Sequence, residues 1–347
     1  MKKPKEAIRT MITEYGNKMA RFRKFLNDYT PATLEERLNN CIIGQPEMVK
    51  AVADFLYYHV LRYVHPELPV RNLLIAGSSG SGKTEVFRRV KEMFGRVMNV
   101  TIADGSRITK EGWSGNYKLQ DMLSPDLDIL VIDEADKLCK PSYSTNGVNV
   151  AEEMQGEFLK LMEGEYEVVA RRKEPAYKIE NLSVVLVGAF EGISEEKKKK
   201  SKIHTIGFGG EKSTTEYVDT DITDEDLIHF GLMPELVGRI SVKVTTNELT
   251  DTDYLTILQN SHGRVTNMLR VLAEYDIQVD DVFSKETIMR FIEQSRTNRT
   301  GFRWVSAQIE NLILESIREK GVQCVEPVEV FEELDEGEWC EMDDEKL

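Results

Sequence analysis

A glycine- and serine-rich stretch near the first quarter of the chain has residue types that could bind phosphate. Residues 77–84 read GSSGSGKT and fit the pattern G-x-x-x-x-G-K-[ST]. Glycines let backbone N–H groups approach phosphate oxygens, Lys83 brings a positive charge to the β- and γ-phosphates, and Thr84 offers a hydroxyl to Mg²⁺. We therefore predict an ATP-binding loop formed by Gly77, Ser78, Ser79, Gly80, Ser81, Gly82, Lys83 and Thr84.

A pair of acidic residues provides the second part of this chemistry. The apolar run DILVID (128–133) ends in Asp133, and Glu134 follows it directly. An aspartate at a strand tip beside a phosphate loop orients the Mg²⁺ shell, and the adjacent glutamate can polarise the attacking water. We predict Thr84 and Asp133 as magnesium residues, and Lys83 and Glu134 as catalytic residues. Small-molecule kinases also use such loops but usually need no water-activating glutamate, so the pair favours ATP hydrolysis.

Short apolar runs that alternate with helical patterns must position these residues. They are NLLIAG (72–77), VMNVTIADG (97–105), DILVID (128–133), LSVVLVGAF (182–190) and the final strand RISVKVTTNELT (239–250). Strands that are apolar throughout are typical of a parallel sheet covered on both faces. We expect an α/β fold, a P-loop NTPase with a parallel central sheet flanked by helices, followed by a smaller, mainly helical domain.

The 347 residues are suited to two domains with extensions. We predict an N-terminal helical extension over residues 1–32, a large nucleotide-binding domain over 33–246, a small helical domain over 247–325 and an acidic tail over 326–347. The sequence leaves open whether the N-terminal helices pack on the large domain or bind a partner.

Composition excludes several classes of function. The net charge of −15 argues against a general nucleic-acid binder. No apolar run approaches the ~20 residues that a membrane span needs, and the basic N-terminus lacks the apolar region of a signal peptide. The four cysteines form no C-x-x-C pair, which argues against zinc and a disulfide framework. We expect a cytoplasmic protein.

Three further segments resemble a known family. From about Leu34 to about Ile317, the chain is similar to AAA+ unfoldases of the Clp type, and most closely to the ClpX family. The segments are IIGQPEMVKAVADFLYYHVLRY, FLKLMEGEYEVV and EDLIHFGLMPELVGRI. The first implies that Ile42, Ile43, Gly44 and Gln45 are candidates for contact with the nucleoside. The last implies that Arg239 is an arginine finger that acts on a neighbouring subunit, which requires a ring, expected to be a hexamer.

The resemblance also implies sites outside the nucleotide loop. Trp113, in the sequence GWSG, falls on the family's aromatic pore loop, whose side chain grips a protein substrate; the other interpretation is a partly buried core aromatic. A small-domain arginine that contacts nucleotide is expected in NRTGFRWV, where Arg303 is preferred over Arg299. The N-terminal segment has no paired cysteines, unlike the zinc-binding domain that begins ClpX.

The stretch KSKIHTIGFGGEKS places two apolar residues in a polar, glycine-rich loop. Ile206, Gly207 and Phe208 match the family's I-G-F tripeptide, which implies docking to a ClpP-type peptidase ring. We expect an ATP-driven unfoldase and translocase that threads proteins through a ring pore into that peptidase, without peptidase activity of its own. One alternative is a stand-alone AAA+ remodelling chaperone. The other is a nucleic-acid ATPase, and the net acidity and the GWSG loop argue against this second alternative.

Overall fold

The computed structural model describes residues 4–108, 117–143, 147–169, 176–179, 181–193, 222–259, 270, 284–297 and 301–320. The chain divides into two compact units, Met1–Asp253 and Tyr254–Leu347. The division falls a few residues after the boundary expected from the sequence. Trp113, the tripeptide at 206–208, Arg299 and the acidic tail lie outside the described residues.

The first unit is built on a five-stranded sheet. Its strands are β1 (Leu73–Ala76), β2 (Val100–Asp104), β3 (Ile129–Asp133), β6 (Ser183–Gly188) and β7 (Val242–Thr245). They are all parallel, in the order β2-β3-β6-β1-β7. The structure thus confirms the predicted parallel sheet. It adds a two-stranded antiparallel sheet, β4 (Glu167–Val168) and β5 (Tyr177–Lys178), that the sequence did not predict.

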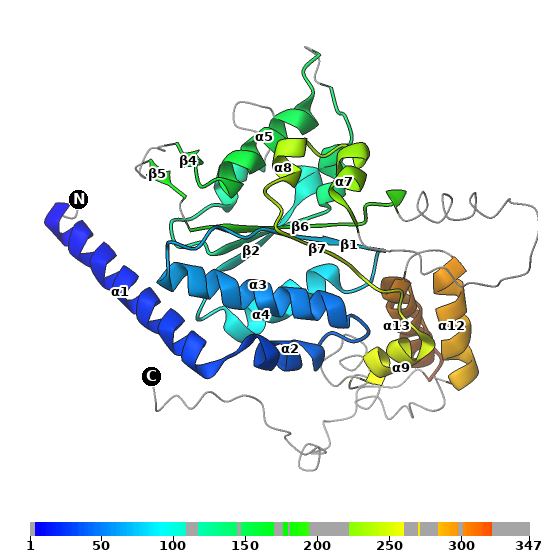
Figure 1. Cartoon of the computed structure of the whole chain (residues 1–347). Coiled ribbons are helices and arrows are strands. Elements are labelled where there is room, and N and C mark those ends of the chain that lie inside the picture. Colours follow the sequence, from blue (N-terminus) through cyan, green and yellow to red (C-terminus); the bar gives the residue numbers. More distant parts are fainter. Residues whose placement is uncertain are drawn as a thin grey trace, which may run out of the picture. The chain divides into compact units, whose positions relative to one another are not determined.

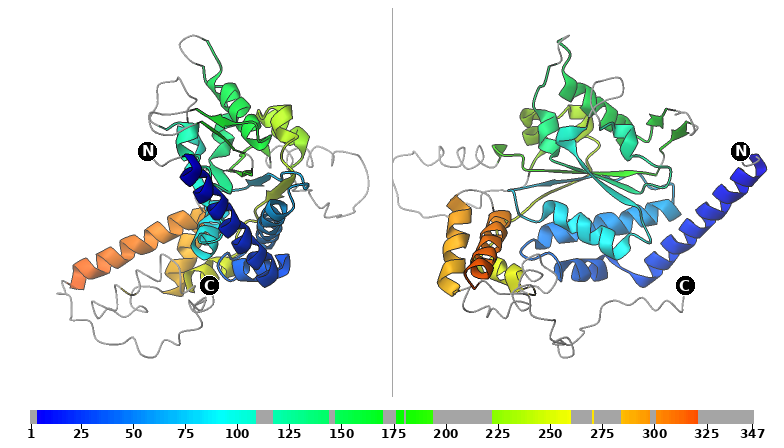
Figure 2. Two further views of the ribbon diagram at one scale, coloured as in Figure 1. Left: turned by 90° about the vertical axis from the view of Figure 1, so that its left-hand side faces the viewer. Right: turned by 180° about the vertical axis from the view of Figure 1, so that it is seen from behind.

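Helices cover both faces of this sheet (Figures 1 and 2). One face carries α1 (Pro4–Asp28), α2 (Pro31–Asn39), α3 (Pro46–Val64) and α4 (Lys83–Phe94). The other carries α5 (Val150–Met162), α7 (Asp224–Phe230) and α8 (Pro234–Val237), with the 3-10 helices η1 (Gly105–Arg107), η2 (Leu119–Met122) and η3 (Ala135–Cys139) around them. None of the helices in the described part of the chain is long and apolar enough to cross a membrane.

Alternation along the strands explains the two layers. In β1, Leu73 and Ile75 pack in the core on the α3 side, whereas Leu74 and Ala76 pack in the core on the α5 side. β3 divides in the same way, and the side chains of Leu130 and Ile132 lie on the α5 side. Successive side chains of a strand point to opposite faces, so a fully apolar strand requires a helical layer on each side.

The N-terminal helix α1 packs on the first unit through buried aromatic residues. Phe22 and Phe25 are buried in the core on the α3 side. The ammonium group of Lys18 lies 2.6 Å from a carboxylate oxygen of Asp128, whose side chain is 1% exposed. The other oxygen of Asp128 accepts a 2.7 Å hydrogen bond from the backbone N–H of Asn99. The described side chains of α1 therefore form part of the first unit, and this favours the packed extension over a separate module.

The second unit is helical in its described part. It contains most of α9 (Asp251–Gln259), together with α12 (Lys285–Thr297) and α13 (Gly301–Lys320). The rings of Phe291 on α12 and Trp304 on α13 meet edge to face, with centroids 6.0 Å apart. The structure therefore confirms the expected helical C-terminal part.

Candidate nucleotide site

The predicted nucleotide residues lie at one edge of the sheet. The last residue of β1, Ala76, is in register with Gly188 at the end of β6, and Asp133 at the end of β3 is in register with Asp104. Because all strands are parallel, their carboxyl ends meet at this edge, where ligands bind in open α/β sheets. β6 lies between β1 and β3, so its tip separates the phosphate loop from the acidic pair.

The phosphate loop has a backbone that requires glycine. Gly77, Gly80 and Gly82 have φ values of 152°, 77° and 92°, which side-chain-bearing residues rarely adopt. A Cβ atom at Gly77 would lie 1.8 Å from the Thr246 hydroxyl oxygen. Thr246 in turn donates a 3.0 Å hydrogen bond to the hydroxyl of Ser81. Thr246, the residue after β7, thus packs directly against the phosphate loop. Gly82 is the N-cap of α4, so the first N–H groups of this helix lie at the loop.

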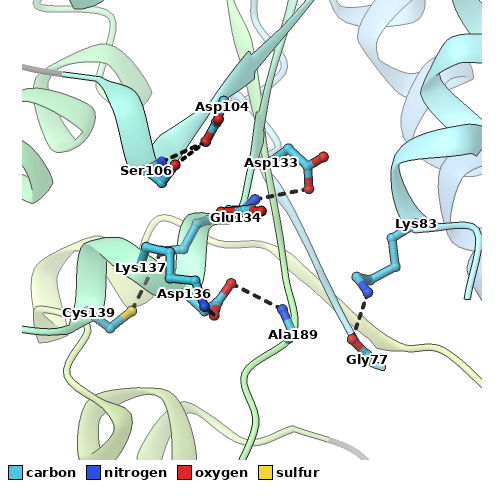
Figure 3. Close-up of polar contacts among 11 residues, drawn as sticks. Gly77, Lys83, Asp104, Ser106, Asp133, Glu134, Asp136, Lys137, Cys139 and Ala189 are labelled. Carbon is cyan, nitrogen blue, oxygen red and sulfur yellow. Dashed lines mark hydrogen bonds and ion pairs between the residues drawn. The ribbon is translucent and has the colours of Figure 1, made fainter. Parts of the chain in front are cut away.

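Figure 3 shows two of the side chains that would contact phosphate and magnesium, Asp133 at the tip of β3 and Lys83, which points to Gly77. Lys83 donates hydrogen bonds of 2.7 and 2.6 Å to the carbonyls of Gly77 and Ser78. Thr84 donates a 2.8 Å hydrogen bond to a carboxylate oxygen of Asp133. A hydroxyl and a carboxylate at this separation are hard oxygen donors, the kind that Mg²⁺ prefers. The residues present therefore fit a nucleotide with its magnesium ion.

Glu134 has an unusual backbone conformation at the tip of β3. Its φ of 54° and ψ of 34° lie in the left-handed region, although it is not glycine. Its N–H donates a 2.9 Å hydrogen bond to Asp133, and the backbone N–H of Lys137 donates to its carbonyl at 3.0 Å. These bonds hold the turn while Glu134 stays exposed to solvent. Strained conformations of this kind cluster at functional sites.

The residues expected to contact the nucleoside lie beside α4. Ile42 is 5% exposed, and its Cγ2 atom lies 4.0 Å from the position of a Cβ on Gly82. Ile43 is partly buried. Gln45 is buried and forms a pair of hydrogen bonds with the backbone of Asn247, at 2.9 and 2.7 Å. The amide of Gln45 thus fixes the chain that follows β7.

The two arginines predicted from the resemblance have different surroundings. Arg239 follows α8, and its side chain is 54% exposed. Its Nε and Nη2 both donate to one oxygen of Glu163, at 3.0 and 2.6 Å. Its carbonyl accepts a 2.9 Å hydrogen bond from Asn72. Arg303 is exposed on α13, in the second unit.

Sequence reasoning did not identify three polar residues around this site. Asp136 is 4% exposed and accepts a 3.2 Å hydrogen bond from the N–H of Ala189; its only sequence signal is the second aspartate of DEAD. Glu163 binds Arg239, as described above. Gln155 of α5 joins the carbonyls of Leu138 and Gly231, at 3.0 Å each. These contacts join segments that are distant in the sequence, so no local pattern reveals them.

Burial and charge shift two pKa values next to the acidic turn. Burial, followed by the nearby charge of Asp136, raises the pKa of the Cys139 thiol to about 12. The hydrogen bond to Asp136, followed by its charge, raises the pKa of Lys137. Lys137 therefore stays protonated and Cys139 stays a neutral thiol at neutral pH.

Comparisons with known proteins agree with this geometry. Residues 73–205 match the model of the ATPase family associated with various cellular activities (AAA). The chain is 30% identical over 326 residues to the ATP-dependent Clp protease ATP-binding subunit ClpX of Treponema denticola, covering 84% of this chain and 77% of that protein. It is 29% identical over 325 residues to the protein of the same name from Borrelia duttonii, covering 82% and 73%. The chain therefore belongs to the ClpX family of AAA ATPases.

Proposed function

We propose that this protein is an ATP-driven unfoldase that threads protein substrates through the pore of a ring and delivers them to a ClpP-type peptidase. The proposal is carried by the observation that the phosphate loop is hydrogen-bonded to the acidic pair at the tip of β3. Thr84 is bonded to Asp133 at 2.8 Å, and Glu134 follows directly at the same edge of the sheet. The names of the relatives, an ATP-binding subunit of an ATP-dependent Clp protease, support the link to proteolysis.

The residues at the sheet edge have separable roles in this proposal. Lys83 would leave the two loop carbonyls and contact phosphate oxygens, and Thr84 and Asp133 would hold the magnesium ion and its waters. Bound Mg²⁺ would neutralise charge that develops on the phosphates. The exposed carboxylate of Glu134 would polarise the attacking water. Ile42 and Ile43 would contact the nucleoside, and Arg303 would serve as the small-domain arginine.

A ring follows from the proposed role of Arg239. Its backbone is held by a hydrogen bond from Asn72, while its guanidinium is half exposed and is bound along one edge by Glu163. An exposed, anchored arginine suits action on the γ-phosphate of a neighbouring subunit. We propose a hexamer in which Arg239 exchanges Glu163 for that phosphate.

Mixing variants tests action between subunits. Arg239→Ala rings should lose hydrolysis, because fingers of this kind contribute about 10³–10⁵-fold in rate. Adding Lys83→Ala subunits, which cannot use ATP but keep Arg239, should partly restore the ATPase rate. Lack of any rescue in a confirmed mixed ring would contradict action in trans, as would full activity of a monomer at high dilution.

Two parts of the proposal rest on the family resemblance alone. Trp113 would grip the substrate in the pore, and Ile206, Gly207 and Phe208 would dock on the peptidase; all four lie outside the described residues. Two apolar side chains entering preformed pockets would gain roughly 1.5–3 kcal/mol each. Several weak loops on one ring would then bind with high avidity. The proposal keeps the cytoplasmic location expected from the sequence.

The proposed substrate class is tested by asking whether unfolded protein or DNA stimulates ATP hydrolysis. ATP turnover should rise when unfolded casein is added and stay at its basal rate when single- or double-stranded DNA is added. The Glu134→Gln variant, supplied with ATP, should retain casein on a sizing column as a trapped complex. Stimulation by DNA and not by casein would contradict the unfoldase proposal in favour of a nucleic-acid ATPase.

A further inference from the structure

The tip of β6 connects the two halves of the nucleotide site through a single peptide unit. The carbonyl of Gly188 accepts a 3.2 Å hydrogen bond from the N–H of Gly77, the first residue of the phosphate loop. The N–H at the other end of the same peptide, on Ala189, donates a 3.2 Å hydrogen bond to Asp136. Figure 3 shows Asp136 pointing toward Ala189, with Gly77 and Lys83 on the other side of β6.

Asp136 is held tightly at this position. Its side chain is 4% exposed, and Oδ1, the oxygen that binds Ala189, lies 2.7 Å from the position of a Cβ on Gly188. Only glycine at 188 leaves room for the carboxylate. The other oxygen, Oδ2, contacts the ammonium group of Lys137 at 3.2 Å on the solvent side.

The opposite side of the turn is equally close-packed. A Cβ on Gly105, after β2, would lie 2.9 Å from the carbonyl oxygen of Asp133 and 3.3 Å from that of Glu134. The acidic turn is therefore enclosed between Gly105 on one strand tip and Gly188 on the other. Its distance from the phosphate loop depends on these contacts, on the Asp136 bond and on the direct hydrogen bond from Thr84 to Asp133.

Backbone strain marks both segments that this bond joins. Among the described residues, the non-glycine residues with positive φ are Glu134 and Phe190, at 54° and 46°. Each lies within two residues of the bond between Asp136 and Ala189. Such conformations persist only where the surrounding structure determines them, and here that structure includes the peptide bridge as well as the hydrogen bonds made by the backbone of Glu134.

We propose that Asp136 is a positioning residue for ATP hydrolysis, which fixes the carboxylate of Glu134 relative to the phosphate loop through the peptide between Gly188 and Ala189. Asp136 would touch neither nucleotide nor water. The inference rests on the proposed hydrolytic role of Glu134. It makes Asp136 necessary for the rate of the chemical step and dispensable for nucleotide binding, which uses Lys83 and the loop backbone.

The experiment measures kcat for ATP and the Kd of a fluorescent ADP analogue for the full chain and four variants. Asp136→Ala removes the acceptor, and we expect kcat to fall by about 10–100-fold, since misplacement by about 1 Å can cost on the order of 10²-fold. The Kd should stay within about 3-fold, because the loop contacts remain. Asp136→Asn keeps an acceptor oxygen of the same reach and should recover most of the lost kcat.

Two further variants separate positioning from folding. Gly188→Ala places a methyl group 2.7 Å from the Asp136 carboxylate and equally close to the Phe190 ring, so it displaces the carboxylate without removing it and should lower kcat while leaving the Kd unchanged. Lys137→Ala removes the solvent-side contact, leaves the Ala189 bond in place and should keep kcat near normal. If Asp136→Ala is insoluble, Gly188→Ala decides the question, since nucleotide binding reports that it is folded.

The outcomes distinguish this inference from the proposed function. Normal kcat in both Asp136→Ala and Gly188→Ala would overturn the positioning role and leave the ATPase assignment intact. Parallel loss of kcat and nucleotide affinity, with no recovery in Asp136→Asn, would also overturn it in favour of a purely structural role. An unmutated protein that binds nucleotide but never hydrolyses it would overturn the hydrolytic function and this inference with it.

Discussion

The contact between Lys18 and Asp128 leads to the stability prediction with the largest expected effect. Asp128 is 1% exposed and lies at the amino end of β3, on the edge opposite the nucleotide loop. It forms an ion pair with the Lys18 ammonium at 2.6 Å and accepts a hydrogen bond from the Asn99 N–H at 2.7 Å. The Asp128→Ala substitution would remove the charged partner of the ammonium group, which keeps its 3.0 Å hydrogen bond to the Asp126 carbonyl, and would leave the Asn99 N–H without its acceptor.

The size of the effect follows from this burial. Removing one partner of a buried ion pair costs about 3–5 kcal/mol, because the other charge stays desolvated. For a unit of this length, each kcal/mol lowers Tm by roughly 2–4 °C. We therefore expect Asp128→Ala to lower the Tm of the nucleotide-free protein by about 6–20 °C.

A second variant isolates the ion pair from packing. Lys18 lies 5.6 Å from the centroid of the Phe22 ring and 5.3 Å from that of Tyr63. Lys18→Met keeps an unbranched apolar chain at this position and removes the charge, together with the contacts of the ammonium group with the two rings. The double variant should then be less destabilised than the sum of the single variants, by about 0.5–3 kcal/mol.

The assay is urea unfolding followed by circular dichroism, with thermal unfolding as a second readout. Lys160→Met is the matched control: its partner is Glu157 at 3.0 Å, and its side chain is 56% exposed. It should change the free energy of unfolding by no more than about 0.5 kcal/mol. Asp128→Ala with an equally small effect, or strict additivity in the double variant, would refute the reasoning that α1 is anchored by a buried charge.

Three further predictions concern the site and its surroundings. Lys83→Ala should weaken nucleotide binding, whereas Glu134→Gln should keep binding and lose about 10²–10⁴-fold in turnover; near-normal turnover of Glu134→Gln in a coupled ATPase assay would show that the residue is misassigned. Trp113→Ala should keep ATP turnover and lose unfolding of a stable tagged substrate, because the indole grips substrate and does not contact nucleotide; equal loss of both activities would favour a core tryptophan. Because the pKa of Cys139 is raised to about 12, only about 10⁻⁴ of the thiol is thiolate at pH 8. As long as the pH is below this pKa, the thiolate fraction rises tenfold for each pH unit. Mass spectrometry after treatment with iodoacetamide at pH 8 should find Cys139 unmodified in the folded protein and modified in urea; rapid modification without urea would contradict its burial.

The strands and the phosphate loop could be predicted because their signals are local. Apolar continuity in ILVID and SVVLVG required two covered faces, and the structure provides them. The glycines of the loop have the positive φ values that the motif requires. Both patterns are contained within a few consecutive residues, so composition and spacing suffice.

The contacts that organise the site could not be predicted in the same way. Asp136 meets Ala189 only because β3 and β6 are adjacent and in a particular register. The partner of Lys18 lies 110 residues further along the chain, and many other carboxylates in this acidic sequence could have been its partner. The short strands β4 and β5, of two residues each, are below the length at which alternation can be recognised.

Degradation of fluorescein-labelled casein by the reconstituted pair tests the proposed function most directly. The assay combines this protein with the ClpP-type peptidase from the same organism and measures the release of labelled peptides. We predict release that requires ATP and both proteins, and that is lost in Phe208→Ala while ATP hydrolysis stimulated by casein persists. ATP hydrolysis stimulated by casein without any peptide release by the unmutated protein would contradict delivery to a peptidase and indicate a stand-alone chaperone.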